Sequence, residues 1–129
     1  MISTTTVHHI RTVLVVDDDA DCRTMLEHTL AFEGFRVVCA RNGREALVLA
    51  HEQRPGVILL DLMMPVMSGY EFRQHQQKDP SLAGIPIVCI SGTYNAEARA
   101  RDIAAAACFT KPLQLDALIG TIRAMFARE

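Results

Sequence analysis

Five short apolar runs, each followed by a segment of helical periodicity, are the feature that most constrains the fold of this 129-residue chain. The runs predict strands at residues 13–16, 35–39, 57–60, 86–90 and 108–110. The first, third and fourth runs are apolar throughout, which is typical of parallel strands covered by helices on both faces. Because the connections are only a few residues long, the sequence predicts an α/β fold with a doubly wound parallel sheet.

Local signals place a helix after each strand. Asp19 is the best N-cap candidate for the first helix, which is expected to stop at Gly34. Asn42 and Ser68 each precede a glutamate by three residues, a spacing that indicates helix N-termini. The fourth helix is rich in alanine and is expected to continue to about residue 107.

Composition excludes several classes of protein. Apolar residues make up 50% of the chain and charged residues 22%, and the formal net charge is -2. These values exclude a strongly basic nucleic-acid binder and an acidic disordered tail. No apolar run approaches the roughly 20 residues of a membrane span, and the N-terminus lacks a secretory signal. We therefore expect a cytoplasmic domain over residues 12–129 that binds neither membranes nor nucleic acid, preceded by a flexible arm, residues 1–11.

The chain has four cysteines, Cys22, Cys39, Cys89 and Cys108, and no CxxC pair. Three of them lie in apolar stretches. We interpret all four as small buried hydrophobic residues in a reduced cytoplasm, not as disulfides or zinc ligands.

Polar side chains follow four of the predicted strands. Asp17 and Asp18 come directly after the first strand and Asp61 after the third, while Ser91 follows the fourth and Lys111 the fifth. Ligands of an open parallel sheet bind beyond the carboxyl ends of its strands, so these residues are expected to converge. The chain has no glycine-rich phosphate loop, which excludes the common nucleotide-binding motifs.

Clustered carboxylates need a cation. Two of them about 5 Å apart repel by roughly 3 kcal/mol at an effective dielectric constant of 20. Oxygen ligands without His or Cys favour a hard ion, and few ligands with open positions favour Mg²⁺. The alternative, that these aspartates only cap the first helix, suits Asp19 alone. Neutralising either Asp17 or Asp61 is therefore expected to stabilise the metal-free fold.

Four segments resemble a known family. The segments VLVVDDDADCR, ILLDLMMPVMSG, PIVCISG and FTKP are similar to the motifs of the receiver domains of two-component response regulators, including the single-domain chemotaxis regulators. The resemblance covers about residues 12–128. It implies a flavodoxin-like (βα)5 sheet with strand order 2-1-3-4-5.

The resemblance also implies a role for each strand-end acid. Asp17 and Asp18 match the acidic pair that holds Mg²⁺, and Asp61 matches the phospho-acceptor, which also touches the metal. Met63 stands where a backbone carbonyl completes the coordination. The phosphoryl donor would be a sensor histidine kinase or a histidine phosphotransfer protein.

The remaining motifs imply groups that neutralise the phosphoryl oxygens. Ser91 matches a hydroxyl that bonds one oxygen, and Lys111 matches a lysine that pairs with another. A cis peptide is expected before Pro112. The resemblance implies a switch with slow autophosphatase activity and not a metabolic enzyme. It also implies that a partner binds the face formed by the fourth helix, the fifth strand and the fifth helix.

The chain departs from the family at the switch region. Cys108 occupies the position of an aromatic residue that accompanies Ser91 in switching, and Phe109 is expected to point to the opposite face. Either signalling is altered, or Cys108 simply packs and nearby groups act instead. Ala104 stands where the family has a glycine, which removes a residue that readily adopts positive φ.

Two other functions are alternatives to a phosphorylation switch. A phosphorylation-independent interaction module with the same fold is compatible with the unusual switch position. A Mg²⁺-dependent phosphatase of the haloacid dehalogenase kind would need an acid two residues after the nucleophile, where this chain has Met63. No DNA-binding or catalytic effector is expected in this chain, and the sequence fits both a stand-alone regulator and a receiver from a larger protein.

Overall fold

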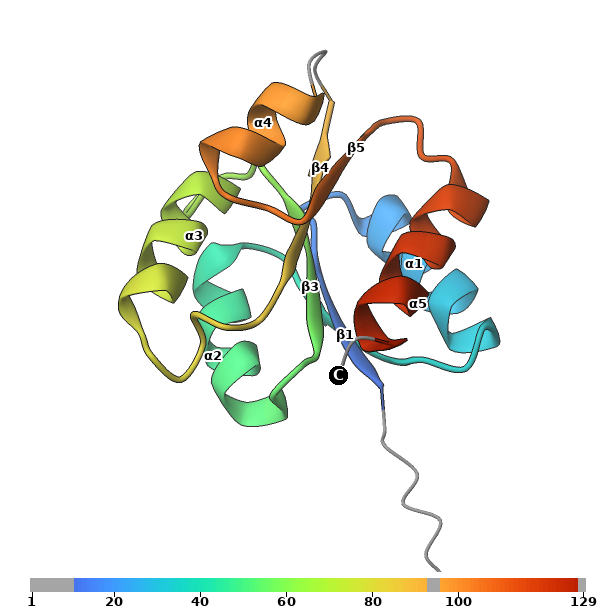
Figure 1. The fold of residues 1–129 in the computed structure, drawn as a ribbon, viewed down its shortest axis with the longest axis horizontal. Coiled ribbons are helices and arrows are strands. Elements are labelled where there is room, and N and C mark those ends of the chain that lie inside the picture. The colour runs from blue at the N-terminus through green and yellow to red at the C-terminus, as the bar shows by residue number, and fades with distance from the viewer. Residues whose placement is uncertain (1–10, 93–95, 128–129) are drawn as a thin grey trace, which may run out of the picture.

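The computed structural model describes residues 11–92 and 96–127, so almost all of the expected N-terminal arm lies outside the described residues. Strands and helices alternate along the chain (Figure 1). Their order and bounds are β1 (Thr12–Val16), α1 (Ala20–Phe32), β2 (Arg36–Ala40), α2 (Gly43–Gln53), β3 (Val57–Asp61), α3 (Gly69–Lys78), β4 (Ile87–Ser91), α4 (Ala96–Asp102), β5 (Ala107–Thr110) and α5 (Leu115–Ala127).

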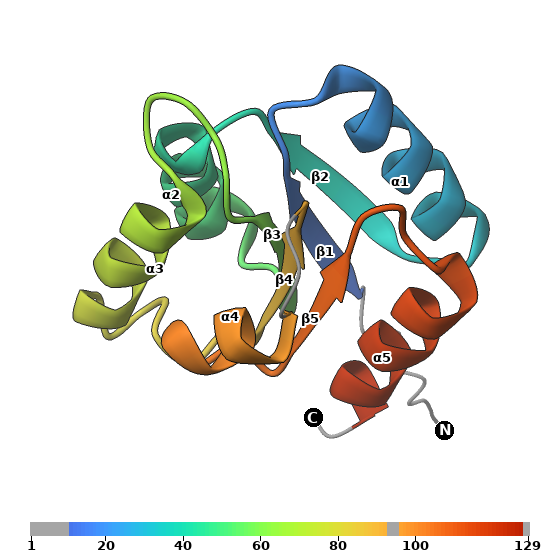
Figure 2. The same cartoon turned by 90° about the horizontal axis from the view of Figure 1, so that it is seen from above.

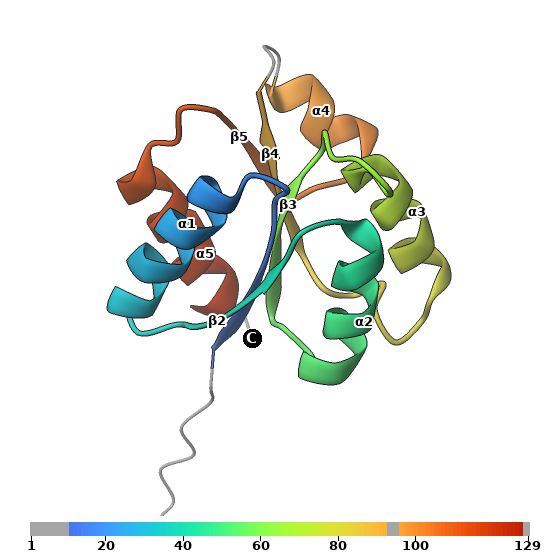
Figure 3. The ribbon, with the colours of Figure 1, turned by 180° about the vertical axis from the view of Figure 1, so that it is seen from behind.

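The sheet confirms the predicted fold class. All neighbouring strands are parallel, and the order is β2-β1-β3-β4-β5. Helices α1 and α5 cover one face, and α2, α3 and α4 cover the other, as the view from above shows (Figure 2). The view from behind shows the same two layers on either side of the sheet (Figure 3). Within the described residues, no helix is long and apolar enough to cross a membrane.

Each face of the sheet has its own apolar core. Strand residues alternate between the two, so Leu14 packs on the side of α2 and α3 while Val13 packs on the side of α1 and α5. Phe72 of α3 is fully buried in the first core, and Leu118 of α5 is fully buried in the second. The central strands β1, β3 and β4 are buried along their whole length, as their uninterrupted apolar sequence predicts.

Helix caps follow the sequence signals closely. Asp19 accepts hydrogen bonds from the N–H groups of Asp21 and Cys22. Asn42 caps α2, and Ser68 forms a capping box at the start of α3. These three predictions are confirmed.

The interpretation of the cysteines is wrong for two of the four. Cys89 and Cys108 are partners in the β4–β5 register, with Cα atoms 4.3 Å apart, and form a disulfide. Their separation of 19 positions in the sequence conceals this pairing, because only strand register brings the side chains together. Cys22 and Cys39 are free and half-buried, and burial raises their thiol pKa values to about 12 and 11.

Helix α4 ends at Asp102, five residues before the predicted end. The N–H of Ala105 donates to Ala100 O and that of Ala104 to Arg101 O, the pattern of a Schellman motif. Ala104 has a φ of 54°, the left-handed conformation that this motif requires. Alanine favours helices but does not determine where a helix stops, so the predicted helix extended beyond the turn that ends it.

Ala104→Gly is expected to raise the free energy of unfolding by about 1 kcal/mol, because glycine adopts positive φ without a steric penalty. The same motif closes α1 around Gly34, whose φ is 95°. Gly34→Ala is therefore the matched control and should lower stability by a similar amount. Urea denaturation of both variants measures the two changes. A loss of stability in Ala104→Gly would contradict this account of the turn.

Candidate functional site

The residues predicted to converge do so at the carboxyl edge of the sheet. Asp17 directly follows β1, Asp61 and Ser91 are the last residues of β3 and β4, and Lys111 directly follows β5. The N–H of Lys111 donates to Ser91 O over 2.9 Å, which fixes the start of the β5–α5 loop beside β4. The Lys111–Pro112 peptide is cis, as predicted.

Three carboxylates form a cluster at this edge. Asp17, Asp18 and Asp61 each offer one oxygen, and these oxygens lie within 4.8 Å of one another. Asp17 and Asp61 are buried, whereas Asp18 is exposed. Oδ2 of Asp17 is buried and, within the described part of the chain, pairs with the Lys111 ammonium without a well-formed hydrogen bond. A buried anionic oxygen of this kind is costly unless a cation compensates it.

Lys111 supplies part of that compensation. Its Nζ lies 3.1 Å from Asp17 Oδ2 and 3.7 Å from Asp61 Oδ2. The lysine side chain is 31% exposed, so the ammonium approaches the cluster from its solvent side. Burial alone would lower the pKa of Lys111, but the two carboxylates outweigh it and raise that pKa.

The two buried carboxylates differ in their electrostatics. Burial opposes ionisation of Asp17, but the N–H of Asp19, the Cys22 thiol and Lys111 favour the anion and lower its pKa. Burial and the charge of Asp17 raise the pKa of Asp61 to about 7, although the Met63 N–H and Lys111 oppose this. Near neutral pH, Asp17 is therefore an anion, while Asp61 is protonated in part of the molecules and ionised in the rest.

The backbone around Asp61 is packed too tightly for a side chain at Gly69. A Cβ there would lie 2.5 Å from the carbonyl oxygen of Asp61 and 2.7 Å from Leu62 Cα. The Gly69 N–H donates to Leu62 O, and the Leu62 N–H donates to Ile90 O. These contacts join β3, β4 and the first turn of α3 directly behind the Asp61 carboxylate.

The donor set fits Mg²⁺. All three acids offer hard oxygen atoms, and the cluster includes the buried Oδ2 of Asp17, whose charge the partly exposed Lys111 ammonium compensates only in part. Met63, two residues after Asp61, donates its N–H to Asp61 Oδ1 over 3.1 Å. The Met63 side chain is exposed, so Met63 adjoins the cluster through its backbone.

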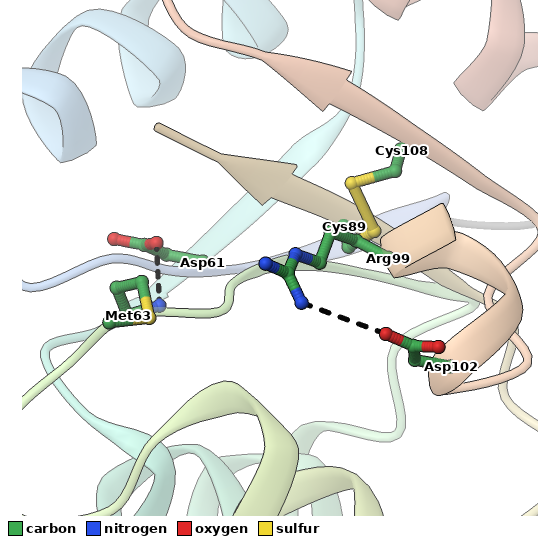
Figure 4. The surroundings of a disulfide bond; sticks show 6 residues. All are labelled: Asp61, Met63, Cys89, Arg99, Asp102 and Cys108. Atoms are coloured by element: carbon green, nitrogen blue, oxygen red, sulfur yellow. Dashed lines mark hydrogen bonds and ion pairs between the residues drawn. A yellow bond between two sulfur atoms is a disulfide. The ribbon is translucent and has the colours of Figure 1, made fainter. Parts of the chain in front are cut away.

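A pocket of about 300 Å³ lies beside the cluster, lined by Leu62, Met63, Tyr70, Ser91 and Arg99. Figure 4 shows the Arg99 side chain reaching from α4 toward the side on which Asp61 and Met63 lie. Arg99 could not be singled out from the sequence, because nothing in an alanine-rich helix indicates which arginine faces the sheet edge.

The switch-region residues Ser91 and Cys108 lie on neighbouring strands, β4 and the edge strand β5. Ser91 is buried at the end of β4, and Cys108 packs with the core beneath α4. Phe109 packs in the core on the other side of the sheet, as strand alternation predicts. The Cys89–Cys108 disulfide joins β4 to β5 two residues before Ser91 and its partner Thr110 (Figure 4).

Comparison with known proteins identifies relatives over almost the whole chain. Residues 13–123 match the response regulator receiver domain. The chain is 36% identical over 118 residues to the probable transcriptional regulator ycf27 of Guillardia theta, covering 90% of this chain and 45% of that protein. It is 36% identical over 119 residues to the response regulator MprA of Mycolicibacterium vanbaalenii, covering 90% and 50%. The chain thus spans about half the length of these two relatives.

A shorter relative matches along nearly its full length. The polar-differentiation response regulator DivK of Brucella anthropi is 30% identical over 115 residues, which cover 88% of this chain and 94% of DivK. Among solved structures, the chemotaxis protein CheY4 of Vibrio cholerae superimposes with a TM-score of 0.83 at 32% identity, over 91% of this chain and 99% of that one. With its strand order, its acidic cluster and these matches, the chain belongs to the response regulator receiver domain family.

Proposed function

We propose that this domain is a phosphorylation switch that accepts a phosphoryl group on Asp61. The observation that supports this most directly is the position of Asp61, buried at the end of β3 with Asp17, Asp18 and Lys111 around it. Phosphoryl transfer depends mainly on positioning and on neutralising charge on the phosphoryl oxygens. This arrangement suits that task.

Each neighbouring residue has a separate role in the proposal. Asp17, Asp18, Asp61 and the Met63 carbonyl hold Mg²⁺, which neutralises phosphoryl oxygens when bound. Asp61 attacks phosphorus with a carboxylate oxygen and becomes an acyl phosphate, while the bond between phosphorus and the donor's histidine nitrogen breaks and its electron pair returns to that nitrogen. Lys111 moves its ammonium from the carboxylates to the new phosphoryl group, and the Ser91 hydroxyl bonds another phosphoryl oxygen. Subsequent attack of water restores the carboxylate, so the switch resets slowly by itself.

The donor proposed for this chain is a phosphohistidine, on a sensor histidine kinase or a histidine phosphotransfer protein. Membership of the receiver family supports this partner class. The face read by a downstream partner is built from α4, β5 and α5, because β5 leads directly into Lys111. We propose a cytoplasmic location and no direct contact with nucleic acid or membrane, in line with the net charge of -2.

Intact-mass spectrometry after incubation with Mg²⁺ and a small phosphodonor tests the proposal. Wild-type protein should gain one phosphoryl mass, and Asp61→Asn should gain none, because an amide cannot form the acyl phosphate. Omission of Mg²⁺ should also abolish labelling, since the acidic cluster then lacks its cation.

Asp116→Asn is the matched control, because Asp116 is an exposed acid in the first turn of α5, outside the cluster. It should be labelled as fast as wild type. Labelling of Asp61→Asn at the wild-type rate would refute the assignment of the acceptor. Absence of labelling in wild type under these conditions, and with a phosphohistidine donor, would favour the phosphorylation-independent interaction module.

A further inference from the structure

The Cys89–Cys108 disulfide links the two strands that end at Ser91 and Lys111 (Figure 4). Ser91 is the last residue of β4, two positions after Cys89, and Lys111 directly follows β5, three positions after Cys108. The Lys111 N–H also donates to Ser91 O. A shift of either residue relative to the other therefore deforms a segment that is tied covalently as well as by hydrogen bonds.

Helix α4 packs over this link and is held down weakly. It contacts both β4 and β5, and its Ala100 packs against the core that contains Cys89 and Cys108. None of the residues 97–102 of α4 is fully buried, and the first buried apolar side chain after them is Ile103. A helix with so little buried apolar surface opens locally at a lower free energy than the whole domain.

The two sulfur atoms differ in access. Cys89 is fully buried in β4, whereas Cys108 is half-buried in the edge strand β5. A reagent that enters where α4 opens therefore meets Cys108 before Cys89. The pair thus offers one sulfur for attack and one as the leaving group.

The oxidation state of the chain is mixed. Cys22 and Cys39 are free thiols, and only the pair that strand register brings together is oxidised. In the cytoplasmic location proposed above, thiol reductants keep most cysteines reduced, and a disulfide that does form is usually transient and redox-sensing. A permanent structural role is the less suitable interpretation for that compartment.

We propose that Cys89 and Cys108 form a reversible redox site that controls the phosphorylation switch. In the disulfide form, β4 and β5 are held together, and Ser91, β5 and α4 cannot rearrange around a phosphoryl group. In the dithiol form, the two strands are joined by hydrogen bonds alone and the rearrangement is free. The control of the switch rests on the proposed phosphorylation of Asp61, whereas the redox site itself does not.

The reductant is a dithiol, and the exchange is balanced. One thiolate of the dithiol attacks Cys108 Sγ, the disulfide breaks, and Cys89 Sγ leaves with the electron pair and takes up a proton. The second thiolate of the dithiol then attacks the mixed disulfide and releases Cys108 as a thiol. The protein gains two electrons and two protons, and the reductant leaves as its own disulfide. A disulfide oxidant reverses both steps.

Thiol counting tests the redox site without any phosphodonor. The oxidised protein is incubated with dithiothreitol in the absence of denaturant, while circular dichroism checks that it remains folded. It is then unfolded and alkylated with iodoacetamide. The number of alkylated cysteines should rise from two, Cys22 and Cys39, to four, and should return to two after oxidation. Reduction only at denaturant concentrations that unfold the domain would overturn the redox site.

Hydrogen exchange of residues 96–110 measures the control of the switch. With Mg²⁺ and acetyl phosphate, both redox forms should gain one phosphoryl mass, because Asp17, Asp18 and Asp61 lie outside the two linked strands. Phosphorylation should change the exchange rates in this segment about tenfold in the reduced protein, within the usual range of coupling between sites. In the oxidised protein the change should be less than twofold.

Two variants separate the disulfide from other effects of a reductant. Cys108→Ala cannot form the link and should respond to phosphorylation like the reduced protein, with or without dithiothreitol. Cys39→Ala is the matched control, because it removes a free half-buried thiol on β2, at the opposite edge of the sheet. It should keep the redox dependence of wild type.

The outcomes distinguish this inference from the proposed function. Equal responses of oxidised and reduced wild type, both labelled, would overturn the control by the disulfide and leave the phospho-acceptor intact. Redox dependence that persists in Cys108→Ala would overturn it as well. Absence of labelling in both redox forms would refute the phospho-acceptor and its control together.

Discussion

Arg73→Met is expected to lower the free energy of unfolding by about 3 kcal/mol, a large effect for one side chain of this domain. Arg73 lies in α3 and is only 9% exposed. Its Nε donates to Ile103 O over 2.7 Å and its Nη2 to Ala104 O over 3.0 Å, directly after α4. Its Nη1 donates to Gln76 Oε1 over 2.6 Å.

The partners of Arg73 explain the size of this effect. A buried ion pair can often be replaced by apolar residues at no cost, because both charges are removed together. Arg73 instead bonds two backbone carbonyls, which remain when the guanidinium is gone. Burial lowers the pKa of Arg73, so the cation is costly to bury, and the hydrogen bonds to the two carbonyls act against this cost.

Urea denaturation measures this change, with Lys78→Met as the matched control. Lys78 is an exposed cation at the end of the same helix, and its replacement should alter stability by less than about 0.5 kcal/mol. Arg73→Lys should lose an intermediate amount, since one ammonium cannot reproduce the planar fork that reaches both carbonyls. Unchanged or increased stability of Arg73→Met would show that burying the charge costs more than its hydrogen bonds contribute.

The fold could be predicted from short-range signals because they agree with one another. Asp19, Asn42 and Ser68 cap the helices that the periodicity indicates. The apolar strands lie at the centre of the sheet, where both faces are covered. The prediction failed at the end of α4, where the Schellman turn around Ala104 depends on tertiary contacts such as those from Arg73.

The residues of the candidate site that lie at strand ends could be predicted from the sequence. Asp17, Asp61 and Lys111 meet because parallel strands present their carboxyl ends on one edge. The Cys89–Cys108 disulfide could not be predicted, because the sequence of neither strand alone determines the register between β4 and β5. Arg99 was missed because the orientation of α4 over that edge decides which of its residues lines the pocket.

The metal-free protein should become less stable relative to Asp61→Asn as pH rises from about 4 to 7. The folded state raises the pKa of Asp61 from 3.8 to about 7, first through burial and then through Asp17. In this window the unfolded carboxyl loses its proton while the folded one keeps it, so rising pH favours unfolding. An asparagine does not titrate and avoids this loss.

The expected advantage of Asp61→Asn grows from near zero at pH 4 to about 4 kcal/mol at pH 8. This is the free energy that corresponds to a shift of about three pKa units, in which the attraction of the carboxylate to Lys111 is already included. Chemical denaturation in EDTA at matched pH values measures the difference, and titrations common to both proteins cancel. An advantage that does not change with pH would contradict the raised pKa of Asp61.

Asp17→Asn should behave in the opposite way, although the sequence alone led to the expectation that neutralising either acid is stabilising. The folded state lowers the pKa of Asp17 despite its burial, because the Asp19 N–H, the Cys22 thiol and Lys111 favour the anion. An acid with a depressed pKa stabilises the fold above its unfolded pKa. At pH 6, where Asp61 is largely protonated, Asp17→Asn should therefore lower stability by about 1 kcal/mol. Above pH 7, Asp61 is ionised and its repulsion with Asp17 becomes part of the balance, so the loss should diminish. A gain in stability at pH 6 would instead mean that repulsion between the two carboxylates, and not the pairing of Asp17 with Lys111, dominates the metal-free site.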